Sequence, residues 1–366
     1  MAIKINWKDL QKRIINWIEV EKVMCNWVQI RPESLPDDYL CFELANSSSG
    51  TVTLTKYGTP TEVSLEYSYD KSTWTDYTMW NSLSLTIWQK IYMRNKSTTP
   101  TWFSIDYMDG YRFSFSGDIS ASWDITYLLC KHGTTTLTSN NCFVSLFSNC
   151  SSLITPPSLQ ATTLTYGCYE SMFNRCTSLT TAPSLPATSL ADRCYKDMFV
   201  RCSSLTSTPS LPATTLANYC YEQMFLRCTG LTSAPSLPAT TLADYCYGNM
   251  FADCTGLTTA PSLPATTLAK WCYFEMFEGC SSLITLPSLP VTTLTDNCYR
   301  VMFWWCSKIK LSSTQTWEYQ TPYRIPTSWS WTDATNSMTD MFYNTGWTFT
   351  GTPSINTTYY TSNTVI

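Results

Sequence analysis

The chain has 366 residues, which is long for one ordinary domain, and a formal net charge of −4 with only 14% charged residues. A weakly acidic chain lacks the basic surface that binds nucleic acid, so we expect no nucleic-acid partner. No run approaches the roughly 18 apolar residues of a membrane span, and the N-terminus lacks the apolar core and cleavage site of a signal peptide. We therefore expect neither membrane insertion nor export through a leader.

Residues 1–33 form a first segment. Apolar side chains recur at helical spacing over 7–17, and the next residues alternate as in a hairpin that turns near Asn26. This opening resembles the short N-terminal segments of Bacteroidales phage proteins, including crAss-like ones, although Trp27 stands where those segments usually carry glycine. The resemblance implies attachment to other virion proteins through residues 1–33. The alternative is a small capping element of the next domain.

Residues 34–128 contain short runs rich in Thr, Tyr, Trp and Phe, such as GTVTLTKYG and YRFSFSGDIS, separated by turn signals. Regular short strands at this spacing are typical of an antiparallel β-sandwich. We expect its aromatic side chains to fill the core rather than to form a ligand platform.

Residues 129–310 are dominated by a repeat with an unbroken period of 26 residues, in which 14 of the 17 cysteines form two columns. A repeat of this length predicts a solenoid whose coils stack on one another. In each coil we expect a short strand after the second cysteine, an extended return through SLPATTL, and a short helix over CYxxMFxxC. Helical phase would then turn the two Cys, the Tyr, the Met and the Phe inward.

The pattern MFxxC(S/T)xLTxxPxLPATTLAxxCY resembles the BspA-like leucine-rich repeats of gut Bacteroidetes surface proteins and of the phages that infect them. The resemblance covers residues 137–310, and the preceding strand region resembles the β-domain that commonly precedes such repeats. It implies a leucine-rich-repeat α/β solenoid used for adhesion or recognition. The expected fold class is therefore α+β multidomain, an antiparallel β-sandwich followed by this solenoid, with 311–366 as a capping region that holds a degenerate repeat.

Three interpretations of the cysteine columns compete. Disulfides within a coil are disfavoured because eight helical residues would hold the two sulfurs about 12 Å apart. A zinc array would need close Cys pairs or histidines, and the only histidine is His132. We expect a ladder of buried free thiols that pack as small apolar side chains and bind no metal. The predicted core thiols are Cys168, Cys176, Cys194, Cys202, Cys220, Cys228, Cys246, Cys254, Cys272 and Cys280.

The residues that vary between copies are predicted to face outward, and they give the candidate ligand site. The position before the first cysteine carries Tyr219, Tyr245 and Trp271 in three consecutive coils, which predicts one outward row of rings. Such a row suits a host glycan or a partner chain, and the alternative is singly exposed side chains or a neighbouring subunit. The predicted site also includes Arg193, Leu226 and Phe274, and we expect the apolar Val200 and Ala252 to lie outward beside Leu226.

A paired Thr column predicts a stabilising ladder between coils, with ice binding as the rival interpretation. No catalytic set of residues stands out, so the sequence favours a non-enzymatic protein without a cofactor. We expect a virion structural protein, a head or tail fibre or decoration, assembled in the host cytoplasm and displayed on the virion surface. It would bind a host-surface glycan or protein and form a homo-oligomer, with a trimer possible. The alternative is a BspA-like adhesin on the bacterial cell surface.

Overall fold

The computed structural model describes residues 23–25, 28–30, 39–60, 62–100, 109–291, 293–325, 334–346 and 349–366. The chain divides into two compact units, 1–38 and 39–366. In the first unit, β1 (Val23–Cys25) pairs antiparallel with β2 (Val28–Ile30). The helix expected over 7–17 lies outside the described residues. In the second unit the strand region, the repeats and the C-terminal region, expected as separate domains, belong to one compact unit.

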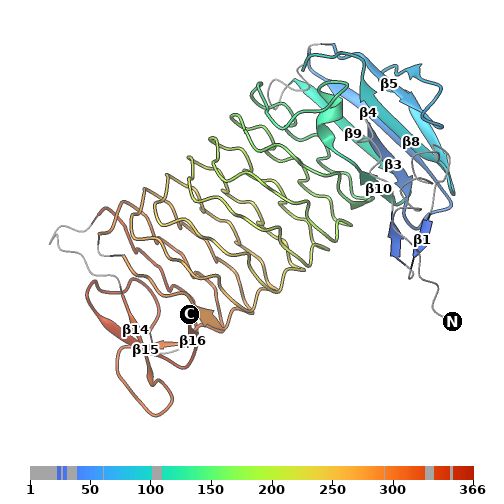
Figure 1. The fold of residues 1–366 in the computed structure, drawn as a ribbon. Helices are drawn as coiled ribbons and strands as arrows, with labels where there is room; N and C mark the ends of the chain where they lie inside the picture. The colour runs from blue at the N-terminus through green and yellow to red at the C-terminus, as the bar shows by residue number, and fades with distance from the viewer. Residues whose placement is uncertain are drawn as a thin grey trace, which may run out of the picture. The chain divides into compact units, whose positions relative to one another are not determined.

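The N-terminal part of the second unit consists of two sheets (Figure 1). The larger has the strand order β11-β10-β3-β8-β5-β6, and the smaller the order β7-β4-β9. Their strands are β3 (Leu40–Leu44), β4 (Ser49–Tyr57), β5 (Leu65–Ser68), β6 (Thr75–Asp76), β7 (Ser82–Thr86), β8 (Lys90–Asn95), β9 (Gly110–Ser116), β10 (Ile119–Ser122) and β11 (Leu153–Thr155). Phe42 of β3 packs on Phe113 of β9 with ring centroids 5.1 Å apart, so the two sheets share one buried core. A 3-10 helix, η1 (Ile125–Leu128), follows β10.

The sheets pass directly into the repeats without a linker. The backbone N–H of Phe113 in β9 donates to the carbonyl of Leu146 (2.8 Å), and its ring stacks on Phe147 at 5.1 Å. β10 pairs in parallel with β11, which belongs to the first coil. Because strands of the sheet region supply the hydrogen bonds and rings that a preceding coil would supply, the first coil is buried on its N-terminal side.

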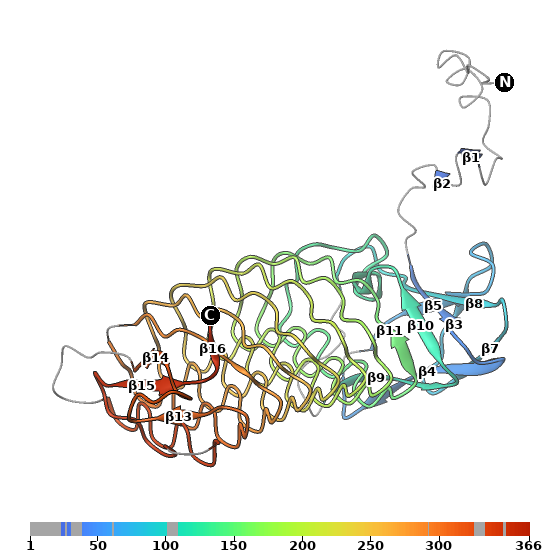
Figure 2. The same ribbon diagram turned by 90° about the horizontal axis from the view of Figure 1, so that it is seen from below.

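The repeats form a stack of coils that lie side by side, as Figures 1 and 2 show for residues 137–310. Equivalent residues of neighbouring coils are linked by isolated parallel bridges, including Thr181↔Ser207, Ser233↔Thr259 and Thr241↔Thr267. Among the described residues of the full repeats, strands are limited to β11 and β12 (Thr285–Leu286). The strand expected after the second cysteine is therefore reduced in most coils to a single bridge, and no continuous sheet runs along the stack.

The segment expected to be helical is instead a run of turns, which we call the turn segment of each coil. The turn segments of the full repeats are 167–176, 193–202, 219–228, 245–254, 271–280 and 297–306. Within 193–202, alternate N–H groups donate to the carbonyl three residues back, as Lys196 does to Arg193 (3.1 Å). The other N–H groups donate to the next coil, as Asp197 does to Glu222 (2.9 Å). The backbone donors are thus shared between local turns and the neighbouring coil, which is incompatible with an α-helix.

Every fourth residue of a turn segment has a positive φ. In the turn segment 193–202 these residues are Arg193, Asp197 and Arg201, with φ of 58°, 57° and 62°. Left-handed backbone costs an L-residue roughly 1–2 kcal/mol, and Asn, Asp and Gly tolerate it best. These three residue types fill nearly half of such positions, including Asn141, Asn149, Gly167, Asn249, Asp253, Gly279, Asn297, Asn336 and Asn344. The chain therefore runs two residues toward the core and then two away from it, and the left-handed residue belongs to the second pair, although some of these residues, such as Ser171 and Val301, are buried.

The predicted fold class is wrong. Among the described residues there is no α-helix, so the chain is neither α+β nor an α/β leucine-rich-repeat solenoid. The error has a physical origin, because a helix and a two-in, two-out turn run both bring residues i, i+1, i+4, i+5 and i+8 to one side. Hydrophobic spacing alone does not separate the two conformations over ten residues.

The C-terminal region covers the last coil. Residues 336–344 form a further turn segment, in which the Tyr299 N–H donates to Ser337 (2.8 Å) and Phe342 stacks on Phe303 at 5.4 Å. A three-stranded sheet follows, in the order β13-β15-β14, while β16 pairs in parallel with β12. These strands are β13 (Leu311–Ser312), β14 (Thr321–Arg324), β15 (Thr358–Thr361) and β16 (Thr364–Val365).

Candidate recognition surface

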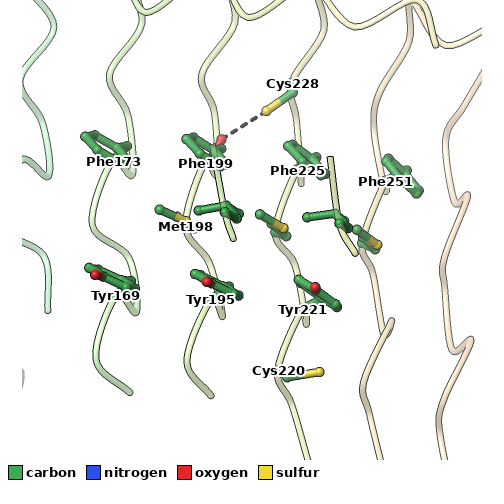
Figure 3. Close-up of a cluster of buried hydrophobic side chains, with 14 of the residues drawn as sticks. Tyr169, Phe173, Tyr195, Met198, Phe199, Cys220, Tyr221, Phe225, Cys228 and Phe251 are labelled. Atoms are coloured by element: carbon green, nitrogen blue, oxygen red, sulfur yellow. Dashed lines mark hydrogen bonds between the residues drawn. The ribbon is translucent and has the colours of Figure 1, made fainter. Parts of the chain in front are cut away.

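The inward residues of the turn segments form continuous buried columns (Figure 3). Tyr195 and Tyr221 stack with centroids 5.8 Å apart, and Phe199 and Phe225 with centroids 5.6 Å apart. The Phe column runs from Phe113 of the sheet region to Phe342 of the C-terminal region without a break. Buried rings packed in this way hold the neighbouring coils in register and give the outward residues a fixed base.

The two cysteine columns differ in their chemistry. In the second column, the Cys228 thiol donates to the carbonyl of Phe199 at 3.0 Å, as Figure 3 shows, and the same bond recurs along the stack. In the first column the corresponding contacts are longer, at 4.0 Å from Cys272 to the carbonyl of Cys298 and 3.7 Å from Cys298 to the carbonyl of Ser337. The cysteines from Cys41 to Cys306 are buried and free, and burial raises the pKa of the thiols in both columns. The predicted core thiols thus lie in the interior. There they stay protonated, and because the thiolate is the reactive form they are unreactive.

The predicted aromatic row exists as a stack. Tyr219 and Tyr245 lie 4.8 Å apart with an interplanar angle of 13°, and Tyr245 and Trp271 lie 5.4 Å apart at 8°. The Arg193 guanidinium lies 5.2 Å from the Tyr219 ring, and Arg300 lies 5.7 Å from the Trp271 ring. Each ring face is therefore covered by a neighbour, and all three side chains are half-buried. Only the ring edges are left for a ligand. Because a sugar stacks on the face of an aromatic ring, these rings do not offer the stacking surface that the sequence predicts.

The other predicted site residues lie in different surroundings. Phe274 packs edge-on against Trp271 at 4.9 Å, and Leu226 is half-buried. Val200 and Ala252 are buried, with 8% and 1% exposure. The expected strip of exposed apolar residues is therefore wrong. It rested on helical phase, whereas turns direct these side chains against their neighbours.

A cluster of charged side chains lies beside the Tyr219 ring. Lys196 pairs closely with Glu222, and Arg193 lies 3.9 Å from the buried Glu170. Asp197 is the third carboxylate beside these two cations, and its Oδ1 is buried without a hydrogen-bond donor among the described residues. The pKa of Asp197 is raised to about 7, chiefly by burial and also by Glu222 and Glu170, against the opposing effect of Lys196. Three carboxylates beside two cations leave one carboxylate uncompensated.

A second group of carboxylates lies in later coils. The Asn249 amide donates to Glu275 at 2.5 Å, and the pKa of Glu278 is raised to about 7 by burial and by the nearby Glu275 and Asp253. Burial also raises the pKa of Glu275. In the described chain no group of three His, Cys, Asp or Glu side chains has the arrangement of a metal site.

The sequence interpretation missed a column of three arginines. Arg175, Arg201 and Arg227 occupy the same position of three consecutive turn segments, all exposed and all with φ near 60°. Arg227 pairs with Asp253 at 3.0 Å, while Arg175 and Arg201 form no ion pair with any described residue. The signal was present in the repeat alignment as R-C at Cys176, Cys202 and Cys228.

No protein-family model, curated protein or solved structure matches this chain. No helix in the described ranges reaches the length and apolarity needed to cross a bilayer.

Proposed function

We propose that this chain is a non-enzymatic virion protein that presents the outward side of its turn segments to the host surface. We call this side the turn face, defined by the outward residues of 167–176, 193–202, 219–228, 245–254 and 271–280. One observation carries the proposal. The inward residues repeat in every coil, whereas the outward residues differ from coil to coil on the same backbone.

The architecture supports recognition rather than catalysis. Packing alone fixes only the inward columns, so a stack that served as a spacer would place no demand on its outward residues beyond solubility. Here the outward residues include stacked rings, ion pairs that bridge coils, and three arginines in register. A rigid stack of exposed, varied side chains is the arrangement in which repeat proteins bind partners.

The remaining parts of the proposal follow from the sequence resemblance. Residues 1–33 would attach the chain to other virion proteins, and the protein would assemble as a homo-oligomer. Mass spectrometry of purified virions should then detect the chain. Its presence in a bacterial surface fraction and not in virions would contradict this assignment and favour the bacterial adhesin.

A blocking experiment tests the turn face directly. In a Cys25→Ser background, Gln223→Cys places one accessible thiol in the middle of the turn face, while the buried thiols stay unreactive because their pKa is raised. Ser236→Cys places a matched thiol at an exposed position outside the turn segments. Coupling a polyethylene glycol maleimide to residue 223 should abolish binding of the labelled protein to host cells, and coupling to residue 236 should leave it. Equal binding of both conjugates would contradict the proposal.

A further inference from the structure

We infer that the column Arg175–Arg201–Arg227, here called the arginine column, binds a linear acidic polysaccharide that carries carboxylate or sulfate groups at regular intervals along its chain. This inference rests on the proposed function and names the class of ligand. It places that ligand at residues other than the aromatic row.

The arginine column is costly for the fold itself. All three arginines have left-handed backbone, a conformation that Asn or Gly would adopt with less strain. The same position carries Asn149 in the coil before and Asn344 in the terminal turn segment. Three like charges also follow one another at the spacing of neighbouring coils, and only Arg227 has an acidic partner. Neither local conformation nor electrostatics within the chain accounts for arginine at these positions.

The spacing of the arginine column fits a polymer with regular charges. Coils joined by backbone hydrogen bonds lie about 5 Å apart, as strands do, so the column spans about 10 Å from its first to its last residue. It begins after Asn149, and of its three cationic positions the first two have no ion-pair partner among the described residues, while the last is paired with Asp253. Guanidinium groups bind carboxylate and sulfate through paired hydrogen bonds, which makes arginine better suited than lysine to such a ligand.

The surroundings of the column favour a polysaccharide over other polyanions. An exposed hydroxyl column, Thr177, Ser203 and Thr229, stands two residues after the arginines in sequence, with a buried cysteine between, and can hydrogen-bond a polyol. Single-stranded nucleic acid requires aromatic faces on which bases stack, and the ring faces of Tyr219, Tyr245 and Trp271 are covered. A protein partner would need an apolar anchor, and the apolar side chains that directly precede the arginines in sequence, Val200 and Leu226, are buried and half-buried.

The test compares two triple variants of the full chain. The first, Arg175→Asn, Arg201→Asn and Arg227→Asn, removes the arginine column in favour of a residue that the same position already accepts. It should melt at or above the wild-type temperature, so lost binding will not reflect lost folding. The second, Lys131→Gln, Lys308→Gln and Arg324→Gln, removes the same charge from positions outside the turn segments.

The probes are polygalacturonate, its fully methyl-esterified neutral form, heparin and single-stranded DNA. We expect the wild type to bind polygalacturonate or heparin, to ignore the ester, and to bind more weakly as salt rises. The Asn triple should lose about tenfold or more in affinity, and the Gln triple should match the wild type. Unchanged binding by the Asn triple, binding by neither acidic polysaccharide, or DNA binding of equal strength through the same arginines would each overturn the inference. Host-cell binding that persists in the Asn triple and is blocked by the residue 223 conjugate would overturn it while the proposed function stands.

Discussion

The inner and outer sides of the turn segments use stacked aromatic rings for different purposes. Inside, the Tyr and Phe columns stack at nearly constant distances in every coil, as with Phe199 and Phe225 at 5.6 Å. Outside, among the residues that the structure describes in the full repeats, stacking between coils involves Tyr219, Tyr245 and Trp271, with a cation over the ring at either end. The same coil spacing produces both stacks. The inner stack consists of residues that recur in every full repeat. The outer stack occurs in three coils only, at positions where the same backbone carries other residues in the other coils.

The largest expected difference between the two sides is energetic. Phe225→Ala removes a fully buried ring from the middle of a column and should lower the free energy of unfolding by about 3–5 kcal/mol. Tyr245→Ala removes a half-buried ring between two neighbours and should cost about 1 kcal/mol. Chemical denaturation of the two variants measures both values. Equal losses would show that the outer stack supports the fold as much as the core does.

The charged cluster on the outer side predicts a stability change with pH. The pKa of Asp197 is raised to about 7 in the folded state from its ordinary value of 3.8, so between these pH values the folded state retains a proton that the unfolded chain has lost. Stability from this group is present below pH 4 and is lost as pH rises through 7, by at most about 1.4 kcal/mol per pH unit. Asp197→Asn removes the uncompensated charge and should raise stability by about 2 kcal/mol at pH 8 and by less at pH 5. A variant as sensitive to pH as the wild type over this range would show that Asp197 is not the titrating group.

Substitution of cysteine by serine should change the stability of the protein differently in the two cysteine columns. Cys228 donates to the Phe199 carbonyl, so the hydroxyl of Cys228→Ser keeps an acceptor within reach. Cys220→Ser buries a hydroxyl where no short thiol–carbonyl bond exists, and leaving it unsatisfied costs about 1–3 kcal/mol. We therefore expect Cys220→Ser to be the more destabilising by about 1 kcal/mol in thermal or chemical denaturation. The reverse order would mean that the thiol–carbonyl bonds contribute nothing specific.

The smallest expected effect is the change in stability caused by Gln223→Asn, and its sign distinguishes a turn from a helix. Gln223 has a φ of 56°, and Asn is favoured in that conformation. Gln223→Asn should therefore stabilise the protein by about 0.5 kcal/mol, whereas in a helix the same change would destabilise it. Leu226→Asn, at a neighbouring position without positive φ, is the control and should not stabilise. Destabilisation by Gln223→Asn would contradict the turn assignment.

The sequence predicts the inward set well because burial follows spacing, and Cys220, Tyr221 and Phe225 are all buried. It does not predict the backbone, because the hydrogen bonds that replace the helix join residues 25 apart, such as Asp197 and Glu222. The clue to the backbone lay in the Asn, Asp and Gly at every fourth position, as at Asn249 and Asp253. The sequence predicts that the aromatic residues form one row. It does not predict that their ring faces are covered, because this depends on the distance between coils and on the direction of the backbone.

The central claim is that inward residues hold the stack while outward residues carry recognition. An exchange within the chain tests it most directly. Glu222→Gly, Gln223→Asn, Leu226→Ala and Arg227→Asp together give the turn segment 219–228 the outward residues of 245–254, a set that the same backbone already carries. The account predicts a cooperative unfolding transition close to that of the wild type and a marked loss of host-cell binding. Undiminished binding, or loss of folding, would contradict it.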